Sequence, residues 1–217
     1  MANRVSKLVL IGALIVTSSV AFGSSTELAP LPPVDTSTMQ SLGQLGPSFY
    51  WVALETKDGL KKDQEVKDMN GKVLVKVGAK FFRGLTLEGT GRLLNGKMLN
   101  WHGKIQRPDG TWEYRYRWCG KEAPYGYGFE GRPLEPFKTI AVDPTVVPLD
   151  SVVFIPAARG AVLPDGTIHD GYFKALDIGS AIINRRIDVF TSFGDQSSVF
   201  DKNGLKHGQA TDVFLVK

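Results

Sequence analysis

The sequence of 217 residues contains one cysteine and three histidines, which excludes several kinds of site. Cys119 has no partner for an intramolecular disulfide, and no histidine stands near it to activate it as a nucleophile. We therefore interpret Cys119 as a packed small side chain. His102, His169 and His207 form no HExxH or His-x-His spacing, so the sequence predicts no metal site.

Signatures of other chemistries are missing as well. The stretch IGSAI, residues 178–182, is not a G-x-S-x-G elbow. The glycines of GTGRLLNG, residues 89–96, lack the strand–loop–helix context of a phosphate-binding loop. We therefore expect no cofactor.

The N-terminal segment is typical of a secretory signal. Arg4 and Lys7 precede an apolar run, and Ala21-x-Gly23 resembles a cleavage site before Ser24. The run is roughly 16 residues long, short of the 20 or so that span a bilayer. We expect a signal peptide over residues 1–23 and a periplasmic or secreted, cell-envelope protein that is free of the membrane after cleavage. An uncleaved N-terminal anchor is the alternative.

Charge gives no reason to expect nucleic acid as a partner. The chain has 26 basic and 22 acidic residues, and cleavage of the signal would remove Arg4 and Lys7, leaving 24 basic residues. The mature chain is thus nearly neutral, and export also argues against a nucleic-acid partner.

We expect the protein to be a monomer.

The rest of the sequence is typical of a β-protein. Residues 24–47, rich in Ser, Thr, Pro and Gly, predict a flexible linker. Residues 48–217 predict one all-β domain of short strands, with residues 55–132 supplying barrel strands plus an inserted wall. One short helix is expected at GDQSSVFDKNG, residues 194–204. Four dipeptides predict hairpin turns: Asn70-Gly71, Asn95-Gly96, Asp109-Gly110 and Asp165-Gly166.

The strand-like stretch WEYRYRW, residues 112–118, alternates aromatic and charged side chains. This alternation predicts a strand with one covered face. Its aromatic side chains either fill a core or form a platform for stacking sugars.

Three aspartates stand in apolar, strand-like sequence. Asp143 ends one apolar run, Asp177 ends the next, and Asp188 opens a third. Asp177 and Asp188 are eleven positions apart and could face one groove. Burial would raise the pKa of such a carboxyl toward the range useful for acid catalysis. The alternative is that all three aspartates accept backbone N–H groups at strand ends.

The segments around these aspartates resemble the three-aspartate (3D) domain. That domain is shared with the C-terminal part of the membrane-bound lytic transglycosylase A family. The resemblance lies in PFKTIAVDPTVVPLDSVVFIP, GYFKALDIGSAIINRRIDVFTSFG and ATDVFLV, between about residues 131 and 216. The order of the aspartates and the spacing of the last two match the family pattern. In two places the chain departs from it, because Ser180 and Asp150 stand where the family has glycine.

The resemblance implies a double-psi β-barrel (barwin-like) with elaborated loops and a groove for the glycan strands of peptidoglycan. It implies cleavage of the bond between N-acetylmuramic acid (MurNAc) and N-acetylglucosamine (GlcNAc), with a 1,6-anhydromuramoyl product. By position Asp188 looks like the general acid/base and Asp177 its partner, with Asp143 a structural or groove-shaping residue. The expected substrate contacts are Asp143, Gly179, Ser180, Ala181, Tyr125 and Tyr127. A glycan-binding module without turnover and a two-carboxylate glycoside hydrolase are the alternatives.

Overall fold

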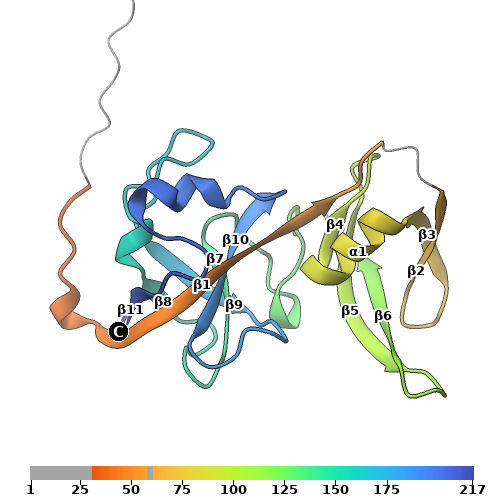
Figure 1. Cartoon of the computed structure of the whole chain (residues 1–217), viewed down its shortest axis with the longest axis horizontal. Coiled ribbons are helices and arrows are strands. Elements are labelled where there is room, and N and C mark those ends of the chain that lie inside the picture. The colour runs from red at the N-terminus through yellow and green to blue at the C-terminus, as the bar shows by residue number, and fades with distance from the viewer. Residues whose placement is uncertain (1–30, 58–60) are drawn as a thin grey trace, which may run out of the picture. The chain divides into compact units, whose positions relative to one another are not determined.

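The computed structural model describes residues 31–57 and 61–217, and the signal peptide expected over residues 1–23 lies outside them. Residues Pro33–Lys217 form one compact unit (Figure 1). The elements are η1 (Thr36–Thr38), β1 (Gln40–Leu54), β2 (Lys62–Lys67), β3 (Val73–Gly78), α1 (Ala79–Glu88), β4 (Thr90–Arg92), β5 (Met98–Gln106), β6 (Trp112–Trp118), η2 (Phe129–Gly131), β7 (Thr139–Val142), β8 (Val152–Phe154), η3 (Pro156–Ala158), β9 (Tyr172–Asp177), β10 (Arg186–Phe193), η4 (Ser197–Asn203) and β11 (Thr211–Leu215).

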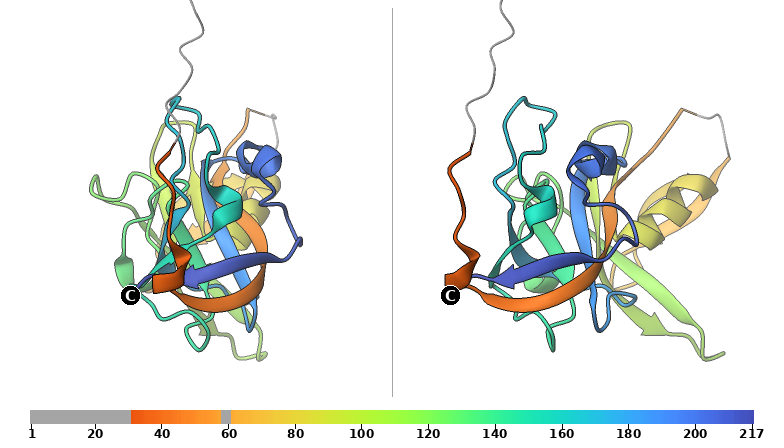
Figure 2. Two further views of the ribbon diagram at one scale, coloured as in Figure 1. Left: turned by 90° about the vertical axis from the view of Figure 1, so that its left-hand side faces the viewer. Right: turned by 60° about the vertical axis from the view of Figure 1, so that its left-hand side comes forward.

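A closed cycle of paired strands forms one half of this unit. In the described part of the chain, β10, β7, β9, β8, β11 and β1 pair in that order, and β1 pairs again with β10. We call these six strands the strand ring (Figure 2). The pairs β1–β10 and β7–β9 are parallel, and the others are antiparallel. The expectation of a mainly β fold is therefore confirmed.

Strand β1 connects the strand ring to the rest of the unit. Its beginning pairs with β11, its middle with β10 and its end with β4 (Figure 1). It begins at Gln40, inside the stretch 24–47 in which the composition predicts a flexible linker. The linker prediction fails there because pairing with β11, remote in sequence, orders a segment whose local composition does not favour a strand.

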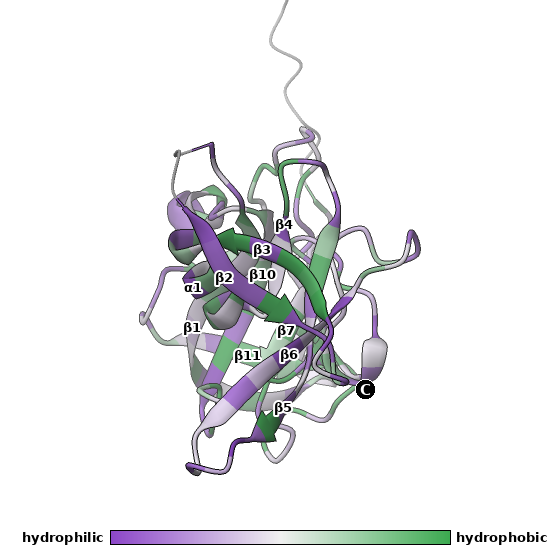
Figure 3. Cartoon of the chain, turned by 90° about the vertical axis from the view of Figure 1, so that its right-hand side faces the viewer, coloured by the Kyte–Doolittle hydropathy of each residue, from purple (hydrophilic) through white to green (hydrophobic). Residues whose placement is uncertain are grey.

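A second group of elements, which we call the side lobe, comprises β2 to β6 and α1. None of its described strands belongs to the strand ring. Strands β4, β5 and β6 extend the sheet from the end of β1, and β2 pairs only with β3. β2 is mostly hydrophilic and β3 mostly hydrophobic (Figure 3).

The short helix expected over residues 194–204 is the 3₁₀ helix η4, and the α-helix α1 was not foreseen. Phe81 and Leu85 stand four residues apart on α1, and both are buried. The helix ends at Gly89, whose φ of 75° lies in the left-handed region. Gly84 lowers helix propensity in its interior, but a Cβ there would lie 3.2 Å from that of Ala53. Close packing against β1 thus outweighs local propensity.

The four dipeptide turns are confirmed. Asn70-Gly71 joins β2 to β3, Asn95-Gly96 joins β4 to β5, and Asp109-Gly110 joins β5 to β6. Asp165-Gly166 lies between the paired residues Val162 and Ile168. The glycine of each dipeptide has a φ between 80° and 84°, a conformation that other residues rarely adopt.

Separate apolar clusters fill the strand ring and the side lobe. The ring cluster centres on residues such as Phe173, Phe200 and Ile187, and the side-lobe cluster packs α1 on β4 to β6. A further cluster, which includes Tyr50 and Phe190 of the ring with Met98 of the side lobe, joins the two. This shared packing fixes β5 relative to β10, the strand that carries Asp188.

Replacing Gly91 with alanine is expected to destabilise the chain by about 1 to 3 kcal/mol. Gly91 lies in β4, and a Cβ there would stand 2.7 Å from the Phe81 ring and 3.0 Å from Leu85. Urea unfolding followed by circular dichroism measures the effect. Gly46→Ala in β1 is the matched control, because its new Cβ would meet only Arg185 O at 3.8 Å. Equal stability of the two variants would contradict tight packing of β4 on α1.

Candidate active site

A cavity of about 700 Å³ lies where the strand ring meets the side lobe. The ring contributes Tyr50, Asp177 and Asp188 to its lining, and the side lobe contributes Glu88 and Trp101. The loop that follows β6 lines a third side of the cavity. The remaining lining residues are Thr86, Leu87, Gly89, Thr90, Asn100, His102, Lys104, Tyr114, Arg117, Tyr127, Gly128, Phe129, Glu130, Gly131, Leu134, Ala141, Ile178, Gly179 and Ser180.

Asp188 is placed in this cavity by the two neighbours of β10. It stands opposite Ser48 in the parallel pair with β1 and opposite Ala141 in the antiparallel pair with β7. Its side chain is half-buried, and its Oδ1 has no hydrogen-bond partner among the described residues. Burial raises the pKa of Asp188 to about 6, against the opposing effects of Ser48, Arg186 and His207. An unpartnered buried oxygen is available to a substrate atom.

Asp177 lies at the end of β9 and is held by hydrogen bonds. Tyr50 Oη donates to its Oδ2 at 3.0 Å, and the Ile178 N–H donates to its Oδ1 at 2.8 Å. Burial raises the pKa of Asp177 to about 7, and the negative charge of Asp188 adds to the rise. The hydrogen bonds act in the opposite direction, because they stabilise the ionised form.

Glu88, the last residue of α1, is a carboxyl of the cavity that the sequence did not reveal. Its Oε2 accepts the Trp51 N–H at 3.2 Å, where the register of β1 and β10 shifts between Tyr50 and Val52. Burial raises the pKa of Glu88 to about 7, and the charges of Asp188 and Asp195 add to this. Glu88 therefore holds β1 in place beside Tyr50. It also adds a third carboxyl, beside those of Asp177 and Asp188, to the lining of the cavity.

Asp143 does not line the cavity, unlike Asp177 and Asp188. Its Oδ1 accepts from the N–H and hydroxyl of Thr145, and its Oδ2 accepts the Asn184 N–H at 2.6 Å. These hydrogen bonds lower the pKa of Asp143. Asp143 thus caps the end of β7 and fixes the loop between β9 and β10. It accepts backbone N–H groups at a strand end, as the alternative interpretation of the aspartates predicts.

The other residues expected to contact substrate divide into two groups. Gly179, Ser180 and Tyr127 line the cavity, whereas Ala181 and Tyr125 do not. Tyr125 packs instead on Phe193, with ring centroids 4.8 Å apart, and belongs to the cluster that joins ring and side lobe. Tyr127 is fixed by its N–H bond to Asn100 Oδ1 at 2.7 Å and by the Arg117 guanidinium 4.1 Å from its ring centroid.

The two departures from the family glycines differ in their backbone conformation. Asp150 has a φ of 64°, in the left-handed region that glycine adopts most easily and aspartate tolerates. Its carboxylate forms two 2.7 Å bonds with Arg132. Ser180 has no positive φ, so a side chain there imposes no backbone strain. It is exposed at the edge of the cavity.

The aromatic side chains of residues 112–118 divide between a buried and an exposed group. Tyr116 is buried in the side-lobe cluster, where its hydroxyl lies 3.2 Å from that of Thr86. Trp112, Tyr114 and Trp118 are exposed, and Tyr114 lines the cavity. Trp101, opposite Tyr116 on β5, is also exposed and lines the cavity. Exposed rings that line a cavity suit the stacking of sugar faces.

The cavity can therefore combine proton transfer with binding of a polar, ring-shaped ligand. The carboxyls of Asp177, Asp188 and Glu88 have pKa values raised to about 7, 6 and 7. A carboxyl that is partly protonated near neutral pH can give up a proton and take one back. No group of His, Cys, Asp and Glu suited to a metal ion occurs within residues 31–57 and 61–217.

Tyr50→Phe is expected to raise the pKa of Asp177 by about one unit, because a hydrogen bond to a charged group contributes roughly 1.5 kcal/mol. The parent pKa is about 7, and the lost Tyr50 hydroxyl is the donor to Oδ2. Titration of the carboxyl carbon by NMR measures the change. Tyr172→Phe removes a hydroxyl outside the cavity lining and serves as the control. A pKa that stays unchanged or falls would contradict this role of Tyr50.

Asp188→Asn is expected to stabilise the chain at pH 8 and to have little effect at pH 4. In the folded state burial raises the pKa of Asp188 from 3.8 to about 6. Well below pH 3.8 the carboxyl is protonated in both states. Between about pH 4 and 6 it is ionised in the unfolded state but still protonated in the folded state, so the folded state loses relative stability as pH rises to about 6. Asparagine avoids this cost, for a gain of about 1 to 3 kcal/mol at pH 8.

Urea unfolding at pH 4, 6 and 8 tests this expectation, with the exposed Asp212→Asn as the control. A variant that is less stable than the parent at pH 8 would show that the buried, ionised Asp188 does not destabilise the folded state.

Comparisons with known proteins bear on the domain and the fold. A family model described as the 3D domain matches residues 138–213. The structure of MltA from E. coli with bound chitohexaose aligns with a TM-score of 0.57 and 12% identity, covering 81% of this chain and 72% of that one. The membrane-bound lytic murein transglycosylase from Agrobacterium tumefaciens aligns with a TM-score of 0.51 and 15% identity, covering 81% and 74%.

At these identities the likeness to solved structures concerns the fold. No curated protein matches the sequence. The matched segment of residues 138–213 includes Asp143, Asp177 and Asp188. Residues 138–213 therefore match the 3D domain, and the chain has a mainly β fold similar to that of the lytic transglycosylase MltA.

Proposed function

We propose that this chain is an exported peptidoglycan lytic transglycosylase with Asp188 as its general acid/base. The observation that carries the proposal is the state of Asp188. Its Oδ1 is buried without a partner, its pKa is raised to about 6, and it lines a cavity of about 700 Å³. Such a carboxyl is suited to exchange a proton with a bound substrate.

The proposed reaction uses the same carboxyl twice. Protonated Asp188 donates its proton to the oxygen that joins MurNAc C1 to GlcNAc, and the C1–O bond breaks to leave a GlcNAc hydroxyl. The muramoyl 6-hydroxyl then attacks C1 and gives its proton to the Asp188 carboxylate. A new C1–O6 bond closes the 1,6-anhydro ring, and Asp188 returns to its protonated form. No water is consumed.

In this proposal Asp177 positions and tunes Asp188. The hydroxyl of Tyr50 and the Ile178 N–H fix the Asp177 carboxyl, and whenever Asp177 is ionised its negative charge favours the protonated form of Asp188. We also propose that the strand ring is the double-psi β-barrel implied by the sequence. Closure of the ring and its two parallel pairs, β1–β10 and β7–β9, support this.

The proposed substrate is the glycan strand of peptidoglycan. The MltA structure that shares this fold has chitohexaose bound, which shows a glycan oligosaccharide on that protein. In this chain Trp101, Tyr114 and Tyr127 offer aromatic rings along the cavity. Such a substrate implies the cell envelope as the location. Among the described residues no helix is long and apolar enough to cross a membrane.

Digestion of purified peptidoglycan, followed by mass spectrometry, tests the proposal. The parent chain is expected to release 1,6-anhydromuropeptides. Asp188→Asn is expected to reduce their yield by about 10² to 10⁴-fold, the range that general acid–base catalysis contributes.

Asp212→Asn, which removes an exposed carboxylate from β11, is the matched control and should keep full activity. Products with reducing ends would instead show hydrolysis by paired carboxylates and water. Glycan binding without any product would show a binding module.

A further inference from the structure

One wall of the cavity carries two basic side chains, and the charge of Glu122 acts on one of them, Arg117, only from beyond ion-pair distance. Lys104 on β5 and Arg117 on β6 both line the cavity. Within the described residues, neither has a carboxylate at ion-pair distance. The lining also carries Asp177, Asp188 and Glu88, which we call the acidic floor, and Glu130, which is paired with Arg132. The cavity is thus electrically asymmetric, with a basic wall and an acidic floor.

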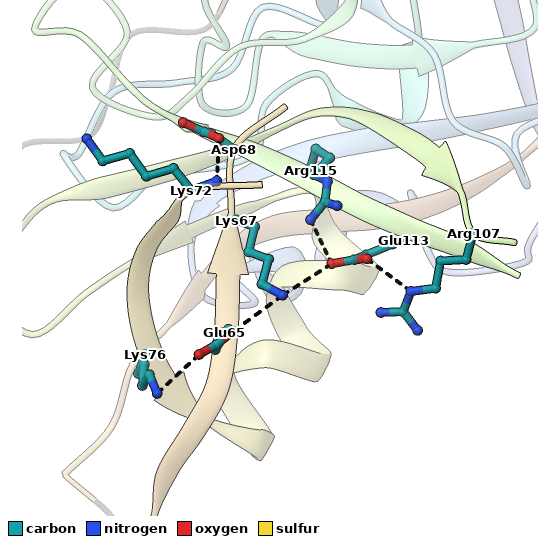
Figure 4. A network of polar contacts seen from close by, with 8 residues as sticks. All are labelled: Glu65, Lys67, Asp68, Lys72, Lys76, Arg107, Glu113 and Arg115. Carbon is teal, nitrogen blue, oxygen red and sulfur yellow. Dashed lines mark hydrogen bonds and ion pairs between the residues drawn. The ribbon is translucent and has the colours of Figure 1, made fainter. Parts of the chain in front are cut away.

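Other cations of the same hairpin are paired with acids. Glu113 of β6 accepts from Arg107 Nε at 3.0 Å and from Arg115 Nη1 at 2.6 Å, and lies 3.9 Å from Lys67 Nζ (Figure 4). The network continues to Glu65 of β2, on a part of the side lobe outside the cavity lining (Figure 4). The hairpin therefore supplies acids for its outer cations but leaves those of the cavity without one.

Aromatic rings hold the two cavity cations in place. Lys104 Nζ lies 4.4 Å from the centroid of the Trp112 ring, and the Arg117 guanidinium lies 4.1 Å from that of Tyr127. A cation held on a ring face keeps its charge and loses little further freedom when it binds an anion. An anion is also the ligand that these groups recognise best, because ammonium and guanidinium groups only donate hydrogen bonds.

We propose that Lys104 and Arg117 bind a carboxylate carried by the glycan strand, and this rests on the function proposed above. Sugar hydroxyls and acetamides are uncharged, so the carboxylate must come from the lactyl ether of a muramoyl sugar or from a peptide attached to it. The acidic floor repels such a group, and the basic wall attracts it. The strand is thereby oriented with its muramoyl substituents toward β5 and β6, and an uncharged chitin oligosaccharide gains nothing from this wall.

Binding measurements by calorimetry at low and high salt test the proposal, with Asp188→Asn in every sample to prevent turnover. The ligands are chitohexaose, glycan strands stripped of peptides, and glycan strands that keep their peptides. Lys104→Met, which keeps an apolar stem on an exposed residue, is expected to weaken binding of a carboxylate-bearing strand about three- to tenfold at low salt. Binding of chitohexaose should stay within about twofold of the parent.

Lys97→Met is the matched control, because Lys97 also lies over a tryptophan, 5.5 Å from the Trp118 ring centroid, but outside the cavity lining. It should change neither affinity. Weaker binding of the stripped strands identifies the lactyl carboxylate as the ligand, and weaker binding of the peptide-bearing strands alone identifies the peptide.

Equal effects of Lys104→Met on chitohexaose and the charged strands, or no effect on either, would overturn the carboxylate site and leave the proposed function standing. A parent chain that binds none of these glycans would overturn both.

Discussion

The candidate site depends on the pairing of β1 with its neighbours. The parallel pair with β10 sets Ser48 opposite Asp188, and two residues further along β1 the Tyr50 hydroxyl holds Asp177. Trp51, the residue after Tyr50, donates its N–H to Glu88 of the side lobe. One strand therefore fixes the ring carboxyls and the side-lobe carboxyl against one another. Displacing β1 by a single residue would turn Ser48 and Tyr50 away from the cavity, because strand side chains alternate between faces.

The burial that suits the site carboxyls to proton transfer also destabilises the folded protein. Burial raises the pKa values of Asp177, Asp188 and Glu88, so each ionised carboxyl costs the folded state free energy near and above neutral pH. The apolar clusters on either side of the cavity offset that cost. Asp143 shows the opposite arrangement. It accepts hydrogen bonds from Thr145 and Asn184, which lower its pKa and suit a structural residue.

Local features of the sequence predicted much of the fold around the site. The four turns followed from Asn-Gly and Asp-Gly dipeptides, because positive φ angles are a local property of those residues. Helix α1 and the early start of β1 were missed, because Gly84 and residues 40–47 adopt their structure through packing against remote strands. Tyr50 was within reach of sequence reasoning, since it alternates with Ser48 along an expected strand. No comparable sequence pattern indicated Glu88.

The sequence by itself determined the resemblance to the 3D domain, the strand-rich character and the choice of Asp177 and Asp188. Motif order and turn residues are local properties of the sequence, so they can be recognised without the structure. Only the tertiary structure decided that Asp143 is a cap, that Tyr125 packs in a core, and that Glu88, Lys104 and Arg117 line the same cavity as Asp188. Burial and charge proximity decide these roles. Both depend on which strands meet across the fold, and no local pattern specifies that.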